Sequence, residues 1–359
     1  MDFLMNIIAF LIVLTPVVFF HELGHYWAAR RSGVTVEVFS VGFGPELFGR
    51  NDKHGTRWKF SAIPLGGYVK MAGDADATSA PSEDGATMAG SFQSASLRAK
   101  AFIVAMGPIA NFILGILIIM GVYIGFGKIT VPTIVGDVQQ GSAAEVAGLE
   151  IGDEILAVDG SRVHNFSTLK TYIFESPGKP LLLTVDRGGR EVDLEITPDT
   201  VEDKCMMASY GRLGVVSVAG ELKSMGPIDA LMEASVDSFT MSLAMLRGIG
   251  RLVTGNANKG EIGGPVKIAE ISGRVANQGL ISFAMFVAII SINLGLVNLL
   301  PVPSLDGGHL MFFGLEGVMG RPISPKVQEM IMRAGMALLL SLIVLVTVFD
   351  ITNVFMSEC

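Results

Sequence analysis

The residues best suited to chemistry in this sequence are His21, Glu22 and His25, which form a His-Glu-x-x-His motif at the end of a long apolar run. Histidines four residues apart lie on one face of a helix, where both imidazoles can bind one zinc ion. The adjacent glutamate can act as a general base towards water. Two buried histidines could instead be satisfied by hydrogen bonds alone, but polar groups in an apolar helix are costly and usually functional. The motif therefore predicts a hydrolytic zinc centre inside a membrane.

The composition is typical of a membrane protein with soluble parts. Half of the 359 residues are hydrophobic, 17% are charged and the mean hydropathy is +0.54. A net charge of −8 without a long basic run gives no indication of a nucleic-acid partner. The two cysteines, Cys205 and Cys359, are too few for a disulfide framework. We therefore expect a lipid bilayer, and no nucleic acid, among the partners.

Four segments are long and apolar enough to cross a bilayer, which takes roughly 20 helical residues. They are residues 3–28, 101–126, 281–300 and 332–349. The first segment is too long for the apolar core of a signal peptide and has no basic residue at its start, so we expect it to be retained. The predicted fold is a polytopic α-helical membrane protein with four transmembrane helices. Its membrane core is divided between residues 1–126 and 281–359.

The basic residues predict the orientation of these helices. They gather in the segments 30–100 and 321–333, next to the ends of the predicted spans, and are missing from both termini. Because basic residues concentrate in cytoplasmic loops, we expect both segments in the cytoplasm and both termini outside. At 1.5 Å per residue, His21 then lies about 27 Å along the first helix, close to the cytoplasmic surface.

A zinc site needs a third protein ligand, and Asp306 is the best candidate. It lies in the segment 298–308, directly after the third span and at the same predicted depth as the two histidines. Taken alone, Asp306-Gly307 could equally be a turn after a helix broken by proline. The shared depth favours a carboxylate ligand.

These residues together resemble the site-2 protease family of intramembrane zinc metalloproteases. The resemblance rests on the first motif and on Asn298-x-x-Pro301-x-Pro303-x-Leu305-Asp306-Gly307. Further matches lie at residues 42–45, 63–71, 107–111 and 263–265, so that nearly the whole chain is covered. More narrowly, the chain is similar to the bacterial branch that acts in sigma-E-type envelope stress signalling by cleaving membrane-spanning anti-sigma factors.

The resemblance implies a site and a setting. It implies Zn²⁺ bound by His21, His25 and Asp306, with Glu22 as the catalytic base. It also implies a multi-pass protein of the bacterial inner membrane that cleaves single-span membrane proteins in regulated intramembrane proteolysis. The active site would lie near the cytoplasmic face.

Residues 34–71 are predicted to form a β-hairpin loop, because glycines separate short β-prone runs. The resemblance implies that this loop is membrane-associated and lies near the site. An extended substrate could pair with an exposed strand edge, and side-chain amides could bind the same backbone. An ordinary loop and asparagines that only pack helices are the alternatives. The candidate substrate-binding residues are Gly42, Gly44, Gly66, Gly67, Asn293 and Asn298.

Two further segments lie outside the predicted membrane core. Residues 72–95 are rich in small and polar residues and are predicted to be a surface insert without catalytic content. Residues 130–199 show two hairpin signals, and their sequence is similar to PDZ domains of bacterial envelope proteases. The strand 133–137 could capture a peptide or protein tail, or this extracytoplasmic domain could only exclude bulky substrates. Residues 200–280 are then a linker with an amphipathic helix at 228–253.

Two other functions are alternatives to peptide-bond hydrolysis in a transmembrane segment. A catalytically silent membrane PDZ binding protein would be expected to have lost one of the four motif residues, and all four are intact. A secondary transporter would show inverted repeats and more spans. The sequence therefore favours the protease.

Overall fold

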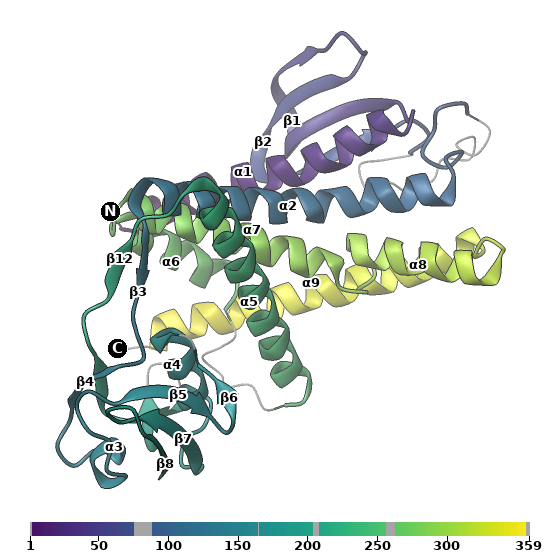
Figure 1. The fold of residues 1–359 in the computed structure, drawn as a ribbon. Helices are drawn as coiled ribbons and strands as arrows, with labels where there is room; N and C mark the ends of the chain where they lie inside the picture. Colours follow the sequence, from purple (N-terminus) through teal and green to yellow (C-terminus); the bar gives the residue numbers. More distant parts are fainter. Residues whose placement is uncertain (1, 75–87, 164, 204–207, 256–262, 357–359) are drawn as a thin grey trace. The chain divides into compact units, whose positions relative to one another are not determined.

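The computed structural model describes residues 2–74, 88–163, 165–203, 208–255 and 263–356 (Figure 1). The chain divides into two compact units. The first unit contains Met1–Val122, Pro227–Arg247 and Gly263–Met356. The second contains Tyr123–Gly226, Gly248–Ile262 and Ser357–Cys359.

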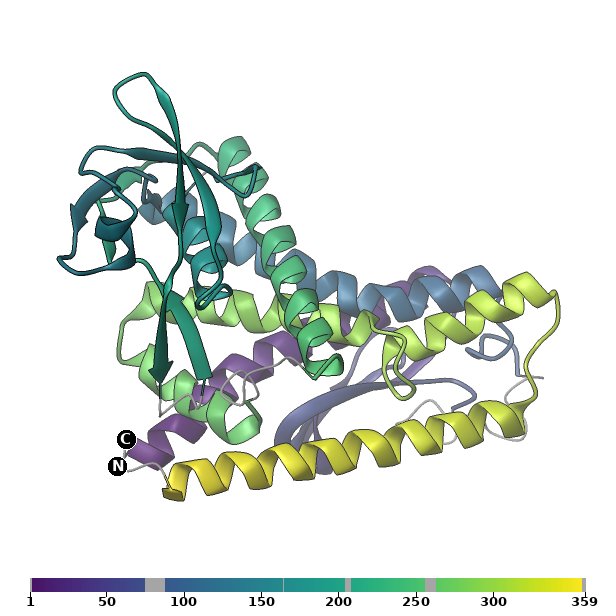
Figure 2. The ribbon, with the colours of Figure 1, turned by 90° about the horizontal axis from the view of Figure 1, so that it is seen from below.

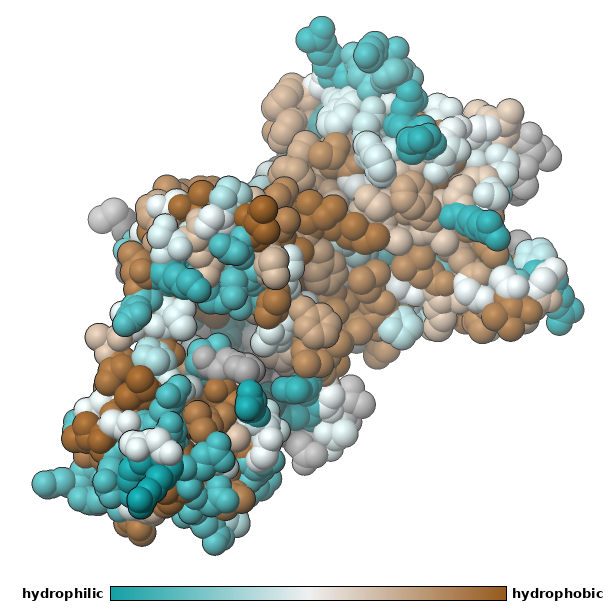
Figure 3. All heavy atoms as spheres, viewed as in Figure 1, coloured by the Kyte–Doolittle hydropathy of each residue, from teal (hydrophilic) through white to brown (hydrophobic). Residues whose placement is uncertain are grey.

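The first unit is built mainly from helices (Figures 1 and 2). The helices that lie in it wholly or in part are α1 (Asp2–Arg31), α2 (Leu97–Phe126), α5 (Pro227–Val253), α6 (Pro265–Ala276), α7 (Leu280–Leu299), α8 (Asp306–Met319) and α9 (Pro325–Met356). Among the described residues, four helical segments are long and apolar enough to cross a membrane: Leu4–Arg31, Leu97–Phe126, Leu280–Leu299 and Lys326–Val348. These match the four predicted spans. Apolar residues cover much of the helical surface seen in Figure 3, as expected for helices that face lipid.

Helices α6 and α8 were not predicted from the sequence. Asp306-Gly307 was weighed as a turn, but Asp306 is the first residue of α8. A Cβ atom at Gly307 would lie 2.1 Å from the Leu300 carbonyl oxygen, so the absence of a side chain lets α8 start directly against the end of α7. With 14 residues α8 is too short to span a bilayer. Its role is to place Asp306.

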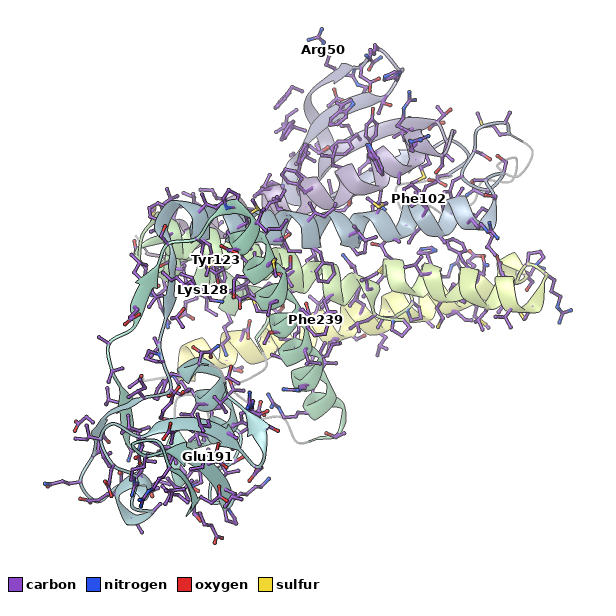
Figure 4. The ribbon with its side chains drawn as sticks, viewed as in Figure 1. Arg50, Phe102, Tyr123, Lys128, Glu191 and Phe239 are labelled. Atoms are coloured by element: carbon purple, nitrogen blue, oxygen red, sulfur yellow. The ribbon has the colours of Figure 1, made fainter. Side chains whose placement is uncertain are left out.

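The predicted hairpin is present as β1 (Val36–Asn51) and β2 (Arg57–Met71), which pair antiparallel. The two strands are bent back on each other, so that Val38–Val41 has a partner on each side: Gly67–Lys70 on one and Arg57–Phe60 on the other. In the described part of the chain, no strand pairs with the second edge of the segment 67–71. This edge remains available for a further strand. Arg50 lies at the far end of the hairpin in Figure 4.

The hairpin is fixed to α1 by aromatic and polar contacts. Phe39 is buried and its ring stacks on Trp58 at 4.2 Å between centroids. Asp52, in the turn between the strands, accepts hydrogen bonds from the Tyr26 hydroxyl at 2.9 Å and the Trp58 indole at 3.1 Å. The same helix that carries the histidine motif therefore holds the sheet.

The segment 72–95 differs in part from the predicted polar insert. Residues 75–87 lie outside the described residues. Phe92, however, is only 9% exposed and packs in one core cluster with Val36 and Phe39. The expectation of a wholly superficial segment is wrong at this end, because one aromatic residue in a polar stretch reaches the core of the hairpin.

The second unit is a small β-rich module. It contains the strands β3 (Lys128–Thr130), β4 (Val135–Val138), β5 (Glu154–Val158), β6 (Ser161–Arg162), β7 (Leu181–Asp186), β8 (Glu191–Ile196), β9 (Asp199–Asp203), β10 (Ala208–Arg212), β11 (Val215–Ser217) and β12 (Glu221–Lys223), and the helices α3 (Ala143–Val146) and α4 (Phe166–Phe174). Strands β6, β5, β7 and β8 form one sheet in that order, and both predicted hairpins are present.

The module continues past residue 199, where the sequence placed a linker. Strand β11 pairs with β4, β12 pairs with β3, and Leu213 is buried in the core of the module. Residues 133–137 are not an open edge either. Val216 pairs with Asp137 on one side, while Val135 exchanges backbone hydrogen bonds with Gly152 and Asp153 on the other. Both edges of the proposed peptide-binding strand are therefore already paired with other segments of this chain.

Helix α5 matches the predicted amphipathic helix and begins one residue earlier. Its small residues Ala230 and Ala234 are buried, whereas large apolar side chains such as Met232 and Phe239 are exposed. Phe239 is labelled in Figure 4. An exposed apolar face of this kind is typical of an amphipathic helix.

Candidate metal centre and active site

Helices α1 and α8 bring three candidate metal ligands together. His21 and His25 lie one turn apart on α1, and their Nε2 atoms are 3.2 Å from each other. Asp306 places its Oδ2 atom 3.2 Å from Nε2 of His21 and 3.5 Å from Nε2 of His25. A tetrahedral ion with bonds of about 2.0–2.1 Å would hold its ligand atoms about 3.3 Å apart. The three spacings therefore suit one zinc ion.

The carboxylate oxygen gives a second indication of a metal site. Among the described residues, the buried Oδ2 atom of Asp306 has no hydrogen-bond partner, although two imidazole nitrogens lie close to it. Burial alone would raise the pKa of Asp306, but the neighbouring His25 and His21 lower it below the ordinary value. An ionised carboxylate beside two imidazoles is a donor set that fits zinc.

Both histidines contact helix α2 through their Nδ1 atoms. The Nδ1 atom of His25 lies 2.9 Å from the backbone oxygen of Ile103, and Nδ1 of His21 lies 3.2 Å from Nδ2 of Asn111. A Cβ atom at Gly107 would lie 2.3 Å from Nε2 of His25, so only glycine leaves room for this ring. Helix α2 therefore determines how the imidazoles are turned.

Glu22 lies between the histidine pair and the sheet edge. Its carboxylate accepts a hydrogen bond from the backbone N–H of Val69 in β2. A Cβ atom at Gly67 would lie 3.1 Å from Cγ of Glu22, so this glycine allows the strand to approach the helix closely. A proton acceptor and an unpaired strand edge thus meet beside the candidate metal ligands.

These groups surround a cavity of about 260 Å³. It is lined by His21, Glu22, His25, Gly67, Tyr68, Val69, Met71, Phe92, Val104, Asn298, Ser304, Leu305, Asp306 and His309. Of the six predicted substrate-binding residues, Gly67 and Asn298 line this cavity. Gly42, Gly44, Gly66 and Asn293 do not. Gly42 and Gly66 have positive φ angles of 92° and 125°, which indicates that they shape the bends of the hairpin.

Several residues of the site have no role predicted from the sequence, among them Phe92, Gly107, Asn111 and His309. Gly107 and Asn111 were visible as one of the motifs in the family resemblance, but only the crossing of α1 and α2 shows what they contact. His309 follows Asp306 by three residues on α8 and lines the cavity. Burial lowers the pKa of its imidazole, which favours the neutral ring.

The comparisons with known proteins identify the family of this chain. The sequence matches Peptidase family M50 over residues 9–342. The chain belongs to this family. Relatives from Agrobacterium fabrum and Rhizobium meliloti, whose provisional names describe them as zinc metalloproteases, are each 39% identical. These matches cover 97% and 96% of this chain and 96% of each relative. Metalloprotease MmpA of Caulobacter vibrioides is 36% identical, over 94% of this chain and 93% of its own. This M50 peptidase is a zinc metallopeptidase.

Two solved PDZ domains match a quarter of the chain. They belong to SdrC-like proteins of Listeria innocua and Listeria monocytogenes and are 21% and 22% identical. The matches cover 26% and 25% of this chain, 99% and 90% of the PDZ domains, with TM-scores of 0.22 and 0.21. Scores at this level do not define the fold of the second unit.

Proposed function

We propose that this M50 peptidase is an intramembrane protease that hydrolyses a peptide bond in or near the transmembrane segment of single-span membrane proteins. One observation carries the proposal. The candidate ligands His21 and His25 and the proton acceptor Glu22 lie on α1, a helix apolar enough to cross a membrane, and Asp306 meets them there. A metal centre in such a helix suits a substrate that is itself in the membrane.

Three residues would hold the metal: His21, His25 and Asp306. When bound, zinc polarises the scissile carbonyl and makes a nearby water molecule more acidic. Glu22 takes the proton from this water and returns it to the leaving amine. Phe92 and Val104 add apolar side chains to the wall of the cavity that contains these groups.

The free edge of β2 would bind the substrate. A transmembrane helix must be opened before its peptide bond is attacked, and each backbone group released in an apolar phase costs several kcal/mol unless it is paired again. The edge 67–71 offers such pairing by strand addition. Its Val69 and Met71 N–H groups are bonded to Glu22 and Asp74, which leaves Gly67 and the outward carbonyl of Val69 for the substrate. The Asn298 amide, also in the cavity wall, could bind the same backbone.

The biological setting is proposed from the resemblance and the charge pattern. Anti-sigma-factor-type substrates in an envelope stress response, regulated intramembrane proteolysis and the bacterial inner membrane all follow from the resemblance to the site-2 protease branch. The distribution of basic residues supports an orientation with the site near the cytoplasmic face and the module outside. For a test, both native cysteines are replaced by serine and single cysteines are introduced at Lys53 or Glu191. An impermeant thiol reagent should label position 191 only. Labelling of position 53 from outside would reverse the orientation.

The catalytic assignment is tested by Glu22→Gln. This variant should keep zinc and bind substrate, because it removes no proposed ligand, but it should not cut a tagged panel of single-span membrane proteins. Glu191→Gln, in the second unit, is the matched control and should cut normally (Figure 4). Cleavage by Glu22→Gln at a near wild-type rate would show that another group accepts the proton.

The second unit is proposed to be a PDZ-like filter that excludes substrates with large outer domains. Delivery of substrate is the rival role, but a membrane-bound substrate already meets the enzyme by diffusion in two dimensions. Thr130 pairs with Glu221, so residues 131–220 can be replaced by a two-residue Asn-Gly turn that joins β3 to β12. The shortened enzyme should cut an untrimmed substrate that the intact enzyme rejects. Slower cutting of a pre-trimmed substrate, with the untrimmed one still resistant, would support delivery instead.

A further inference from the structure

A histidine that binds zinc through Nε2 must carry its proton on Nδ1. The neutral imidazole has one N–H donor and one lone pair, so the partner of Nδ1 decides whether Nε2 is free to bind a metal. In the candidate centre both histidines present Nε2 to Asp306. Each Nδ1–H therefore needs an acceptor on the opposite side of its ring.

His25 has such an acceptor in the main chain. Its Nδ1 atom lies 2.9 Å from the Ile103 carbonyl oxygen, which can only accept. This contact fixes the proton of His25 on Nδ1 and leaves its Nε2 lone pair for the metal. No side chain is needed for this purpose.

His21 depends on a side chain instead. Its Nδ1 atom lies 3.2 Å from Nδ2 of Asn111, which can only donate. With the amide in this orientation, Nδ1 of His21 must accept, so that the proton sits on Nε2 and blocks the metal position. In the same amide the Oδ1 atom is buried and has no hydrogen-bond partner in the described part of the chain.

A half-turn of the amide removes this conflict. The two ends of an amide have the same shape, so the rotation needs no extra space and brings Oδ1 to the position that faces Nδ1 of His21. The main chain of Asn111 is held meanwhile by Ser291 of α7, whose hydroxyl donates to the Asn111 carbonyl oxygen at 2.8 Å. Asn111 itself is completely buried, so water does not replace the bond.

We propose that Asn111 is a positioning residue for the zinc centre: its side-chain oxygen accepts Nδ1–H of His21 and thereby directs the Nε2 lone pair of that ring to the metal. The inference rests on the proposed ligand set and adds an outer contact to it. Without this acceptor, His21 can take the other tautomer, in which Nε2 is protonated and does not bind zinc.

The test is the zinc dissociation constant of the full-length protein in detergent, measured by competition with a chelator of known affinity. Asn111→Leu keeps the size of the side chain but removes the acceptor, and should weaken zinc binding by about 10- to 100-fold. Asn111→Asp keeps an acceptor and should bind zinc within about threefold of the wild type or more tightly. Ser341→Ala in α9 is the control, because the Ser341 hydroxyl donates to the Ala337 carbonyl oxygen of its own helix and not to the site, and this variant should leave zinc affinity unchanged.

If Asn111 only packs the helices, the zinc affinities of the two Asn111 variants should follow the reverse order. Leucine would then be tolerated and a buried aspartate would be the more harmful substitution. Zinc binding by Asn111→Leu at wild-type strength, or weaker binding by Asn111→Asp than by Asn111→Leu, would overturn the proposal. If the leucine variant does not fold, the aspartate variant decides: a loss of more than tenfold overturns the proposal and retained affinity supports it. Zinc that survives in His21→Ala would refute the ligand set itself, which is a distinguishable result.

Discussion

A single methyl group added to helix α2 should displace the metal ligand His25, although His25 itself is not substituted. In Gly107→Ala, the new Cβ atom would lie 2.3 Å from Nε2, 2.4 Å from Cε1 and 2.9 Å from Cδ2 of His25. Ordinary van der Waals contact begins at 3.4 Å, so the imidazole has to move by about 1 Å. The Cβ atom is fixed to the helix backbone and cannot turn away.

The size of this shift decides the outcome. Zinc–nitrogen distances in proteins stay within about 0.2 Å of their mean, so a shift of about 1 Å takes His25 out of the coordination sphere. Loss of an outer contact to a ligand typically weakens metal binding 10- to 100-fold. Loss of the ligand itself should therefore weaken zinc binding by more than about 100-fold. Peptidase activity should fall with zinc occupancy.

Gly121→Ala in the same helix is the matched control, because a Cβ atom there would have nothing within 4 Å. Alanine favours a helix over glycine by about 1 kcal/mol, so both variants should keep α2 helical. The assay is zinc competition on purified protein, with circular dichroism to confirm the fold. Unchanged zinc affinity in Gly107→Ala would mean that His25 does not bind the metal from this position, and the assigned ligand set would be wrong.

Three further outcomes are expected. Asp306→Asn should lower the zinc content measured by elemental analysis, because the amide is a weaker ligand, and full occupancy would require another third ligand. Burial alone would raise the pKa of Asp52, but hydrogen bonds from Tyr26, Trp58 and the turn hold it at about 2, below the ordinary 3.8. Asp52 therefore stabilises the hairpin above about pH 4 and loses this effect as the pH falls towards 2. In Asp52→Asn, limited proteolysis of the hairpin should be faster at pH 7 and change less on acidification; equal rates in both proteins would contradict this. Arg187→Leu should increase proteolysis of the second unit, because Arg187 makes two hydrogen bonds to the buried Asp153, and an unchanged rate would refute that role.

The sequence predicted those parts of the structure that depend on local patterns. Helix periodicity places His21 and His25 on one face, and segment length identifies the four spans. Asp306 is distant in sequence, but the membrane limits where the chain can go, and the position of Asp306 directly after the third span predicts the same depth as that of the histidines. Its meeting with them at 3.2 and 3.5 Å follows from the packing of α8 against the end of α7.

Contacts between elements distant in sequence could not be predicted in the same way. The role of Asn111 depends on how closely α2 crosses α1, which in turn depends on Gly24, where a Cβ atom would lie 2.1 Å from the Met106 carbonyl oxygen. Strand β11 pairs with β4 across a gap that includes the whole four-stranded sheet. Phe92 is the one aromatic residue in the polar stretch 72–95, and only tertiary packing shows that it is buried.

The division of the site between elements has a consequence for its assembly. Helix α1 supplies two candidate ligands and the proton acceptor, and two of its residues also bond the sheet: Glu22 bonds Val69 in the free edge and Tyr26 bonds Asp52 in the turn. Asp306 is the one candidate ligand that another helix carries. The position of α8 therefore decides whether the three ligand atoms lie close enough for one metal, and substitutions at the start of α8 should alter zinc affinity while the contact between α1 and the sheet stays intact.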